Sequence, residues 1–191
     1  MEKIKIILYG ASGHSRVVSS LLEPNTHNFI GYHDDNDELK SFNGSKTLGL
    51  YNQNSNKDCQ MVISIGDNQT RKKVSQKILH PFSTLISQHS IISKDVSIGE
   101  GTVVVQGAIV QANTQIGKHV IVNTKSSVDH DCFIEDFVHI APNATLCGGV
   151  HIGQGTLVGA SATVLPGVKI GNWCVVGAGS IVTKDLPDHS I

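Results

Sequence analysis

Residues 98–182 can be written as a series of hexads: IGEGTV VVQGAI VQANTQ IGKHVI VNTKSS VDHDCF IEDFVH IAPNAT LCGGVH IGQGTL VGASAT VLPGVK IGNWCV VGAGSI V. Every hexad begins with Ile, Val or Leu, at Ile98, Val104, Val110, Ile116, Val122, Val128, Ile134, Ile140, Leu146, Ile152, Val158, Val164, Ile170, Val176 and Val182. The residue two places before each of these is small or β-branched. A hexapeptide period is typical of a parallel β-helix, in which each repeat supplies a short strand and a turn. Because three hexads form one triangular coil, the pattern predicts about five coils, in which residues eighteen apart stack about 4.8 Å from each other.

The composition of the 191-residue chain argues against several kinds of partner. The chain carries 15 basic and 16 acidic side chains, so no excess of charge favours nucleic acid or an anionic membrane. The apolar stretch Ile4–Tyr9 is too short for a membrane span or a signal peptide, and we interpret it as a buried strand. The four cysteines show no zinc-like spacing, and Cys132 and Cys174 fall on interior positions of the repeat. We therefore expect a cytoplasmic protein with reduced thiols and no metal.

The first part of the chain alternates apolar strands with helical segments. The expected elements are Lys3–Tyr9, Ser15–Leu22, Phe29–His33, Met61–Ile65 and Asn68–Leu79, with a weak strand near Thr47–Leu50. Asn68 is a candidate N-cap of the second helix. This alternation predicts βαβ units and a short parallel sheet. The predicted fold class is therefore α/β plus all-β, with a small Rossmann-like βαβ domain over residues 1–88 and a β-helix of hexapeptide repeats over residues 89–191.

A glycine-rich turn follows the first strand and opens the first helix. Such a turn offers free backbone N–H groups and the positive end of the helix dipole to a phosphate. The full GxGxxG fingerprint is absent, so NAD(P) is not favoured. An acid pair ends the second strand, where an acid meets a ribose or base edge in nucleotide-binding folds. The residues of this predicted nucleotide site are Gly10, Ser12, Gly13, His14, Asp34 and Asp35.

The segment Asp129-His130-Asp131 carries the best candidate for acid–base chemistry. His130 comes two residues after interior Val128, so it lies at a corner of the coil and points outward. Asp131 could accept the second ring proton of His130, fix its tautomer and raise its basicity. Gly148 lies eighteen residues further on, so its backbone N–H is expected beside His130 as a donor to a developing oxyanion. A base next to an oxyanion donor is what acyl transfer requires; an exposed corner histidine without function is the alternative.

His139 precedes interior Ile140 in the middle of a flat face, nine residues from His130. Nine residues are half a coil, so the two histidines point to opposite sides of the prism and cannot share a site within one chain. Flat faces of a short solenoid usually pack against copies of themselves, and we expect a homotrimer with active sites at the subunit interfaces. In that trimer His139 of one chain could face His130 of the next. We interpret His119 and His151 as surface residues.

Two runs of small residues, Gly159-Ala160-Ser161 and Gly177-Ala178-Gly179, are stacked at one corner of the predicted coils. Tight corners favour glycine, so coil geometry alone explains them. A smooth channel in which a long, thin ligand lies against backbone amides is the functional interpretation, and both can hold together. Gly159, Ser161 and Gly177 are therefore candidate coenzyme contacts.

Taken together, the motifs resemble the PglD-type family of bacterial nucleotide-sugar acetyltransferases, which has a left-handed β-helix. The segments that carry the resemblance are Tyr9-Gly10-Ala11-Ser12-Gly13-His14, Asp34-Asp35, Ile65-Gly66-Asp67-Asn68 with Arg71-Lys72-Lys73, Asn123-Thr124, His130-Asp131-Cys132 and Phe137-Val138-His139. They extend over nearly the whole chain. The hexads alone indicate only a superfamily, and the N-terminal motif joined to them is much more specific.

The resemblance implies roles for particular residues. It makes His130 the general base, supported by Asp131 where family members often have Glu. It implies that His139 helps to bind acetyl-CoA and that the Gly148 amide faces the acetyl carbonyl. It also implies that the glycine-rich turn, the acid pair and Gly66 hold the nucleotide of the sugar. The expected reaction is acetyl transfer from acetyl-CoA to the 4-amino group of a nucleotide-linked, by resemblance UDP-linked, 4-amino-4,6-dideoxy sugar in bacterial glycan biosynthesis.

Three alternatives stay open at this point. The same site could acetylate a sugar hydroxyl, as on sialic acid. The stack could resemble a γ-type carbonic anhydrase, which holds zinc between histidines across a trimer interface, or it could be a non-catalytic scaffold that binds a nucleotide sugar. Family members usually continue past the position of Ile191 with a Val-Gly-x-Pro-Ala-like segment near the coenzyme, so for a sequence that stops there we expect a weakened adenine site.

Overall fold

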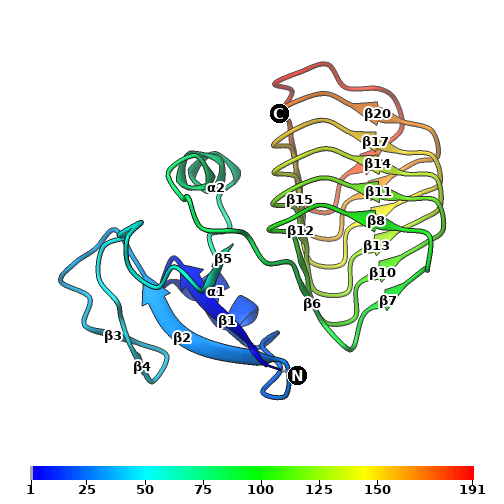
Figure 1. Cartoon of the computed structure of the whole chain (residues 1–191). Helices are drawn as coiled ribbons and strands as arrows, with labels where there is room; N and C mark the ends of the chain where they lie inside the picture. The colour runs from blue at the N-terminus through cyan, green and yellow to red at the C-terminus, as the bar shows by residue number, and fades with distance from the viewer. Residues whose placement is uncertain (1) are drawn as a thin grey trace. The chain divides into compact units, whose positions relative to one another are not determined.

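The computed structural model describes residues 2–191, which belong to two compact units, Met1–Leu85 and Ile86–Ile191. Figure 1 shows a small α/β unit, blue to green along the chain, and a solenoid of stacked coils, green to red. The sequence placed the boundary between residues 88 and 89. The units divide slightly earlier because the chain already joins a sheet of the solenoid at β6 (Leu85–Ile86).

Three parallel sheets form the walls of the solenoid (Figure 1). The first contains β6, β9 (Val103–Val104), β12 (Ile121–Val122), β15 (His139–Ile140), β18 (Leu157–Val158) and β21 (Val175–Val176). The second contains β7 (Ile91–Ile92), β10 (Ile109–Val110), β13 (Ser127–Val128), β16 (Thr145–Leu146), β19 (Thr163–Val164) and β22 (Ile181–Val182). The third contains β8 (Ser97–Ile98), β11 (Gln115–Ile116), β14 (Phe133–Ile134), β17 (His151–Ile152) and β20 (Lys169–Ile170). The predicted parallel β-helix is confirmed.

The core of the solenoid is made by the residues that begin the hexads. Val122, Ile140 and Val158 lie directly above one another in β12, β15 and β18, and each is fully buried. The residue two places before the start of each hexad also points inward, and where it carries a hydroxyl group it can donate to a backbone carbonyl, as Thr114 does to the Asp129 oxygen. The interior therefore buries aliphatic side chains while its few polar atoms remain hydrogen-bonded.

The first unit is built on a short parallel sheet with the order β2-β1-β5. Its elements are β1 (Ile4–Tyr9), α1 (Gly13–Ser19), β2 (His27–His33), β3 (Ser41–Phe42), β4 (Ser45–Lys46), β5 (Gln60–Ile63) and α2 (Asn68–Ser75). The βαβ organisation predicted for this part is therefore present. Neither α1 nor α2, the two helices in the described residues, is long and apolar enough to cross a bilayer.

Two local predictions in this unit were wrong. No strand forms at Thr47–Leu50, where Thr47 makes only an isolated bridge to Tyr32. The β-structure of this segment is a hairpin just before it, formed by β3 and β4. The hairpin turns at Asn43-Gly44, both with positive φ, which is a strong hairpin signal that the sequence analysis missed. The N-cap of α2 is Asp67 rather than Asn68, because the Asp67 carboxylate accepts the Thr70 N–H.

His119 is also not the surface residue that was predicted. Only 4% of its surface is exposed, and its ring stacks on Phe137 with centroids 5.2 Å apart and planes 10° apart. It also covers Gly101, where a Cβ atom would lie 2.3 Å from its Nδ1. These residues occupy equivalent corners of three successive coils, so the aromatic ring at one level is buried by its neighbours.

Replacing a buried isoleucine of the solenoid by alanine should cost much more stability than replacing an exposed one. Ile140→Ala should lower the free energy of unfolding by about 2 to 5 kcal/mol, because it leaves a cavity between two coils. Ile181→Ala, at a side chain that is 68% exposed on the same solenoid, should change it by about 0.5 kcal/mol or less. Urea unfolding followed by circular dichroism measures both, and equal losses would contradict this assignment of the core.

Candidate active site

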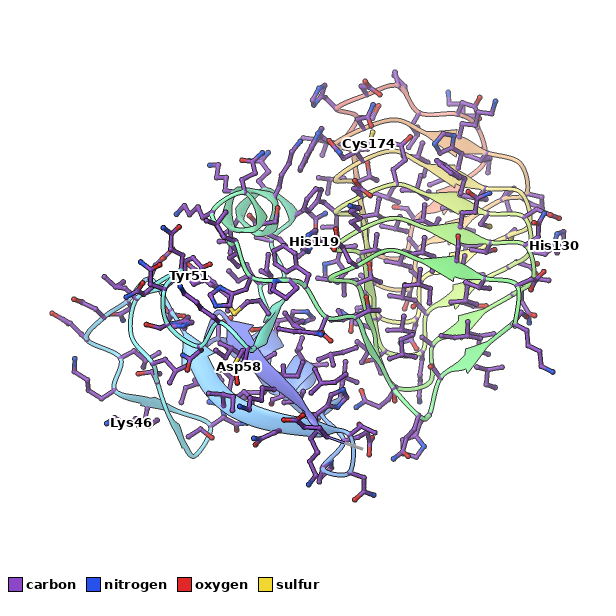
Figure 2. All side chains as sticks on the ribbon, viewed as in Figure 1. Lys46, Tyr51, Asp58, His119, His130 and Cys174 are labelled. Carbon is purple, nitrogen blue, oxygen red and sulfur yellow. The ribbon has the colours of Figure 1, made fainter. Side chains whose placement is uncertain are left out.

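His130 lies on the turn between β13 and β14, and Figure 2 shows it at the outer edge of the solenoid. Its Nδ1 is 2.7 Å from Oδ2 of Asp131. Because an ionised carboxylate only accepts hydrogen bonds, Nδ1 carries the proton and Nε2 keeps a lone pair. The hydrogen bond to Asp131, and then the negative charge of Asp129, raise the pKa of His130 above its ordinary value. The ring is thus a base with a fixed tautomer.

Asp131 is held from a second side. Its Oδ1 accepts a hydrogen bond of 2.6 Å from Nδ2 of Asn113, one coil earlier. The hydrogen bonds from Asn113 and from His130 hold the pKa of this carboxyl below its usual range. Asp131 therefore stays ionised when it faces the imidazole.

Gly148 lies against the ring of His130, one coil further along. A Cβ atom at this position would be 2.6 Å from Cε1 and 2.7 Å from Nε2 of His130, so only glycine leaves room for the ring. The coils are joined here by the hydrogen bond from Gly149 N to the His130 oxygen, at 2.9 Å. Within residues 2–191, the Gly148 N–H donates to no acceptor. A free backbone donor and a basic nitrogen therefore lie on neighbouring coils.

His139 belongs to β15, in a different sheet from the strands that flank His130. In Figure 1 the label of β15 is on one side of the solenoid, and in the same view Figure 2 places His130 on the other. The structure does not bring the two histidines together within one chain.

The orientation of His139 is set by Asn123, which is 9% exposed. Asn123 Nδ2 is 3.0 Å from Nε2 of His139, and Asn123 Oδ1 accepts the Thr124 N–H at 2.8 Å. Because a backbone N–H can only donate, the amide oxygen faces Thr124 and the amide nitrogen faces His139. Nε2 of His139 therefore accepts, and the ring is neutral with its proton on Nδ1.

At the corner formed by residues 159–161 and 177–179, packing alone explains one of the glycines. A Cβ atom on Gly159 would lie 2.5 Å from the Val176 oxygen and 2.7 Å from the Ala178 nitrogen, so the next coil excludes any larger side chain. A Cβ atom on Gly177 would meet only the Ser180 hydroxyl, at 3.3 Å. Gly177 and Ser161 are exposed, so these two remain the accessible members of the predicted coenzyme channel.

His151, on β17 of the third sheet, pairs with Glu135 at 2.9 Å and has 39% of its side chain exposed. It is the surface residue that the sequence predicted. No group of three or more His, Cys, Asp or Glu side chains that could hold a metal ion occurs among residues 2–191.

In the first unit, Asp34 holds the glycine-rich turn in place. Its Oδ2 accepts the Ala11 N–H at 2.7 Å, and its Oδ1 accepts the Asn36 N–H at 2.9 Å. Gly10 has φ of 101°, a conformation that glycine adopts readily, and a Cβ atom there would lie 2.6 Å from Ile65. Asp34 and Gly10 therefore have structural roles that explain their presence.

Ser12 and Gly13 of the glycine-rich turn are exposed, and so is Asp35, which follows β2. Asp35 is exposed, and its Oδ1 accepts a 2.6 Å hydrogen bond from the hydroxyl of buried Tyr9. Burial and this contact raise the pKa of Tyr9, so the hydroxyl stays protonated and fixes the carboxylate. Ser12 makes no side-chain cap bond, and a Cβ atom on Gly13 would meet nothing within 4 Å. These residues could contact a ligand without displacing other groups of their unit.

His14 and Gly66 lie side by side at the next loop, where a Cβ atom on Gly66 would be 3.9 Å from His14. Burial, and then the charge of Arg71, lower the pKa of His14 to about 4, so the ring is neutral. Arg71 is 1% exposed and donates to the carbonyl oxygens of Ile65 and Gly66 at 3.2 and 3.0 Å. A buried guanidinium therefore holds this loop.

The whole chain has close structural relatives. The acetyltransferase domain of PglB from Neisseria gonorrhoeae FA1090 superposes with a TM-score of 0.90 and 33% sequence identity over 96% of this chain and 93% of that one. This chain belongs to the PglD-like family. Residues 5–78 match the PglD N-terminal domain, and residues 131–164 and 149–184 match the bacterial transferase hexapeptide (six repeats), as expected for a left-handed β-helix.

Two further PglD-like structures were solved with ligands. The PglB acetyltransferase domain in complex with acetyl coenzyme A has a TM-score of 0.90 and 30% identity, and the match covers 98% of this chain and 94% of that one. A variant of perosamine N-acetyltransferase from Caulobacter crescentus, in complex with CoA and GDP-perosamine, has a TM-score of 0.91 and 31% identity over 96% of this chain and 90% of that one. The family predicted from the motifs is thus confirmed.

Sequence reasoning missed several residues that shape these sites. Asn113 stands eighteen residues before Asp131, so the stacking rule could have found it. Asn123 appeared only as part of a family motif, because its contact with His139 joins positions sixteen apart that no simple period relates. Tyr9 and Arg71 appeared only within an expected strand, an expected helix and the family motifs, and only the fold shows that their polar ends hold Asp35 and the Gly66 loop.

The hydrogen bonds of Asn123 predict the tautomer of His139. In the wild-type protein, long-range ¹H–¹⁵N spectra of [¹⁵N]histidine-labelled chain should show His139 protonated at Nδ1. Asn123→Asp replaces the donor by a carboxylate oxygen, so the proton should move to Nε2 or the ring should become cationic. Asn143→Asp, which adds the same charge twenty residues further along the solenoid, should leave the signals unchanged. An Nε2-protonated ring in the wild type would contradict the assignment.

Proposed function

We propose that the chain transfers acetyl from acetyl-CoA to the 4-amino group of a nucleotide-linked 4-amino-4,6-dideoxy sugar, for bacterial glycan biosynthesis. The observation that carries the proposal is that the His130 ring, with Nδ1 held by Asp131, lies so close to Gly148 that a Cβ atom there would be 2.7 Å from Nε2. Acetyl-CoA and a nucleotide-linked amino sugar are suggested by the relatives solved with acetyl coenzyme A and with GDP-perosamine. The cytoplasm is the expected compartment, since the four cysteines are free thiols.

The chemistry follows from the two polar groups of this corner. His130 Nε2 accepts a proton from the attacking amine as the N–C bond to the acetyl carbon forms. The Gly148 N–H donates to the oxygen that becomes negative at this stage. The imidazolium, stabilised by Asp131, then returns its proton to the sulfur as the C–S bond breaks. The products are the acetamido sugar and CoA thiol, and His130 ends in its original tautomer.

The coenzyme and the nucleotide are assigned to different groups of residues. His139, whose ring Asn123 orients, is assigned to acetyl-CoA as the family resemblance implies, and Gly159, Ser161 and Gly177 line the corner assigned to the coenzyme. Asp35, Ser12 and Gly13 suit the nucleotide in the first unit, with Asp34, Gly10, His14 and Gly66 shaping the turn. UDP is the expected nucleotide from the family resemblance, and GDP is the alternative because GDP-perosamine is bound by one relative.

The active protein is proposed to be a homotrimer whose sites combine two chains. His130 and His139 lie in different parts of the coil, so the two side chains cannot meet in one site of a single chain. A site that uses both therefore needs two chains. A closed cyclic assembly lets the same surfaces meet at every interface.

The central test is turnover of acetyl-CoA, read as free thiol, with UDP- and GDP-linked 4-amino sugars. Wild type should acetylate one of them, and His130→Ala should lower kcat by about 10² to 10⁴, the usual contribution of a general base. The raised pKa of His130 means that kcat/KM should fall as the pH drops through a midpoint above 6.5, because protonation removes the lone pair.

Matched variants separate the two substrates in this assay. Asp35→Asn should raise KM for the nucleotide sugar and leave KM for acetyl-CoA unchanged, whereas Asp37→Asn, an exposed acid of the same loop, should alter neither. Acetylation of hydroxyl acceptors alone would favour a sugar O-acetyltransferase. Zinc-dependent hydration of CO2 in place of thiol release would favour the carbonic-anhydrase-like alternative, and no turnover of any kind would favour a scaffold.

The shared site predicts complementation between inactive chains. His130→Ala and His139→Ala should each abolish most activity, but random co-assembly should restore about a quarter of the sites, because each intact site needs one residue from each kind of chain. Light scattering should give the mass of three chains. Failure to recover activity from mixed trimers would show that both histidines act within one chain.

A further inference from the structure

The His130–Asp131 pair is unusually exposed for groups that must keep a fixed geometry. The side chain of His130 is 60% exposed and that of Asp131 is 54% exposed. Ion pairs at such exposure are screened by water, and holding two mobile side chains together costs conformational entropy. A single hydrogen bond between adjacent residues therefore does not explain why the carboxylate stays on Nδ1.

A third residue restrains the carboxylate from the preceding coil. Asn113 donates from Nδ2 to Asp131 Oδ1, at 2.6 Å, while Asp131 Oδ2 accepts from His130 Nδ1 at 2.7 Å. Both oxygens of Asp131 are thus occupied by donors on opposite sides. The amide orientation is unambiguous, because the carboxylate can only accept and the Asn113 oxygen would repel it.

The coil itself positions Asn113. Asn113 and Asp131 have the same left-handed backbone conformation, with φ of 58°, and they lie eighteen residues apart at equivalent corners. The Asn113 backbone N–H donates to Oδ2 of Asp95, the equivalent residue one coil earlier, at 2.9 Å. Hydrogen bonds therefore link Asp95 to the Asn113 backbone and the Asn113 side chain to Asp131, in a series across three coils that ends at His130.

We propose that Asn113 is a positioning residue for the base, holding the Asp131 carboxylate on His130 Nδ1 so that Nε2 faces the reacting amine. Asn113 contacts neither substrate and acts only through Asp131. The proposal rests on the proposed function insofar as His130 is the base, but the position of the carboxylate can be measured without any substrate.

Two substitutions separate position from charge. Asn113→Gly removes the amide and tolerates the left-handed backbone. The carboxylate should then leave Nδ1 part of the time, so the titration midpoint of His130 should fall and kcat should drop on the order of tenfold, with both KM values unchanged. Asn113→Asp should also lower kcat, because two carboxylates repel, but the added negative charge should raise the midpoint of His130.

The measurement is an NMR titration of the His130 ring in the free protein, paired with the pH profile of kcat/KM. Asn56→Gly, at an asparagine with φ of 52° in the first unit, controls for the loss of a left-handed asparagine and should change neither. An unchanged or raised midpoint in Asn113→Gly would overturn the proposal, and if only stability fell the role of Asn113 would be structural. If wild type acetylated no acceptor but the midpoints moved as expected, the positioning role would stand and the proposed function would fall.

Discussion

The hydrogen bonds between successive coils support the whole second unit, because a strand of two residues has no stability of its own. Each strand donates to the next coil, as Ser127 does to the Ala144 oxygen and Asp129 to the Leu146 oxygen, both at 2.9 Å. The aliphatic residue of each hexad lies between its counterparts above and below, which removes it from water. Together these hydrogen bonds and stacked side chains fix the register of the coils, so residues eighteen apart lie next to each other.

The candidate catalytic corner is a direct product of that register. Asn113, Asp131 and the Gly148–Gly149 pair come from three consecutive coils, and no two of these levels are close in the sequence. The backbone supplies the spacing, and the side chains add only short contacts. This explains how a geometry suited to proton transfer can be built from exposed residues on a turn, where packing around the side chains is slight.

The glycines illustrate how packing and function can be separated. Gly148 must lack a side chain because the His130 ring lies against it, and Gly159 because the next coil does. Gly10 needs its backbone conformation, whereas open space surrounds Gly13. The same contrast applies to the acids of the first unit. Both carboxylate oxygens of Asp34 accept backbone N–H groups, whereas exposed Asp35 accepts the Tyr9 hydroxyl through Oδ1 only.

The hexad pattern by itself determined the β-helix, the outward corner position of His130 and its contact with Gly148, because periodicity decides which residues occupy equivalent places. The alternation of apolar strands and helices likewise determined the βαβ unit. Only the tertiary structure decided which neighbours bond: that His119 is buried under Phe137, that Asn113 restrains Asp131, and that Asn123 sets the tautomer of His139. The physical reason is that a period specifies level and face, whereas a hydrogen bond depends on the direction of each donor and acceptor.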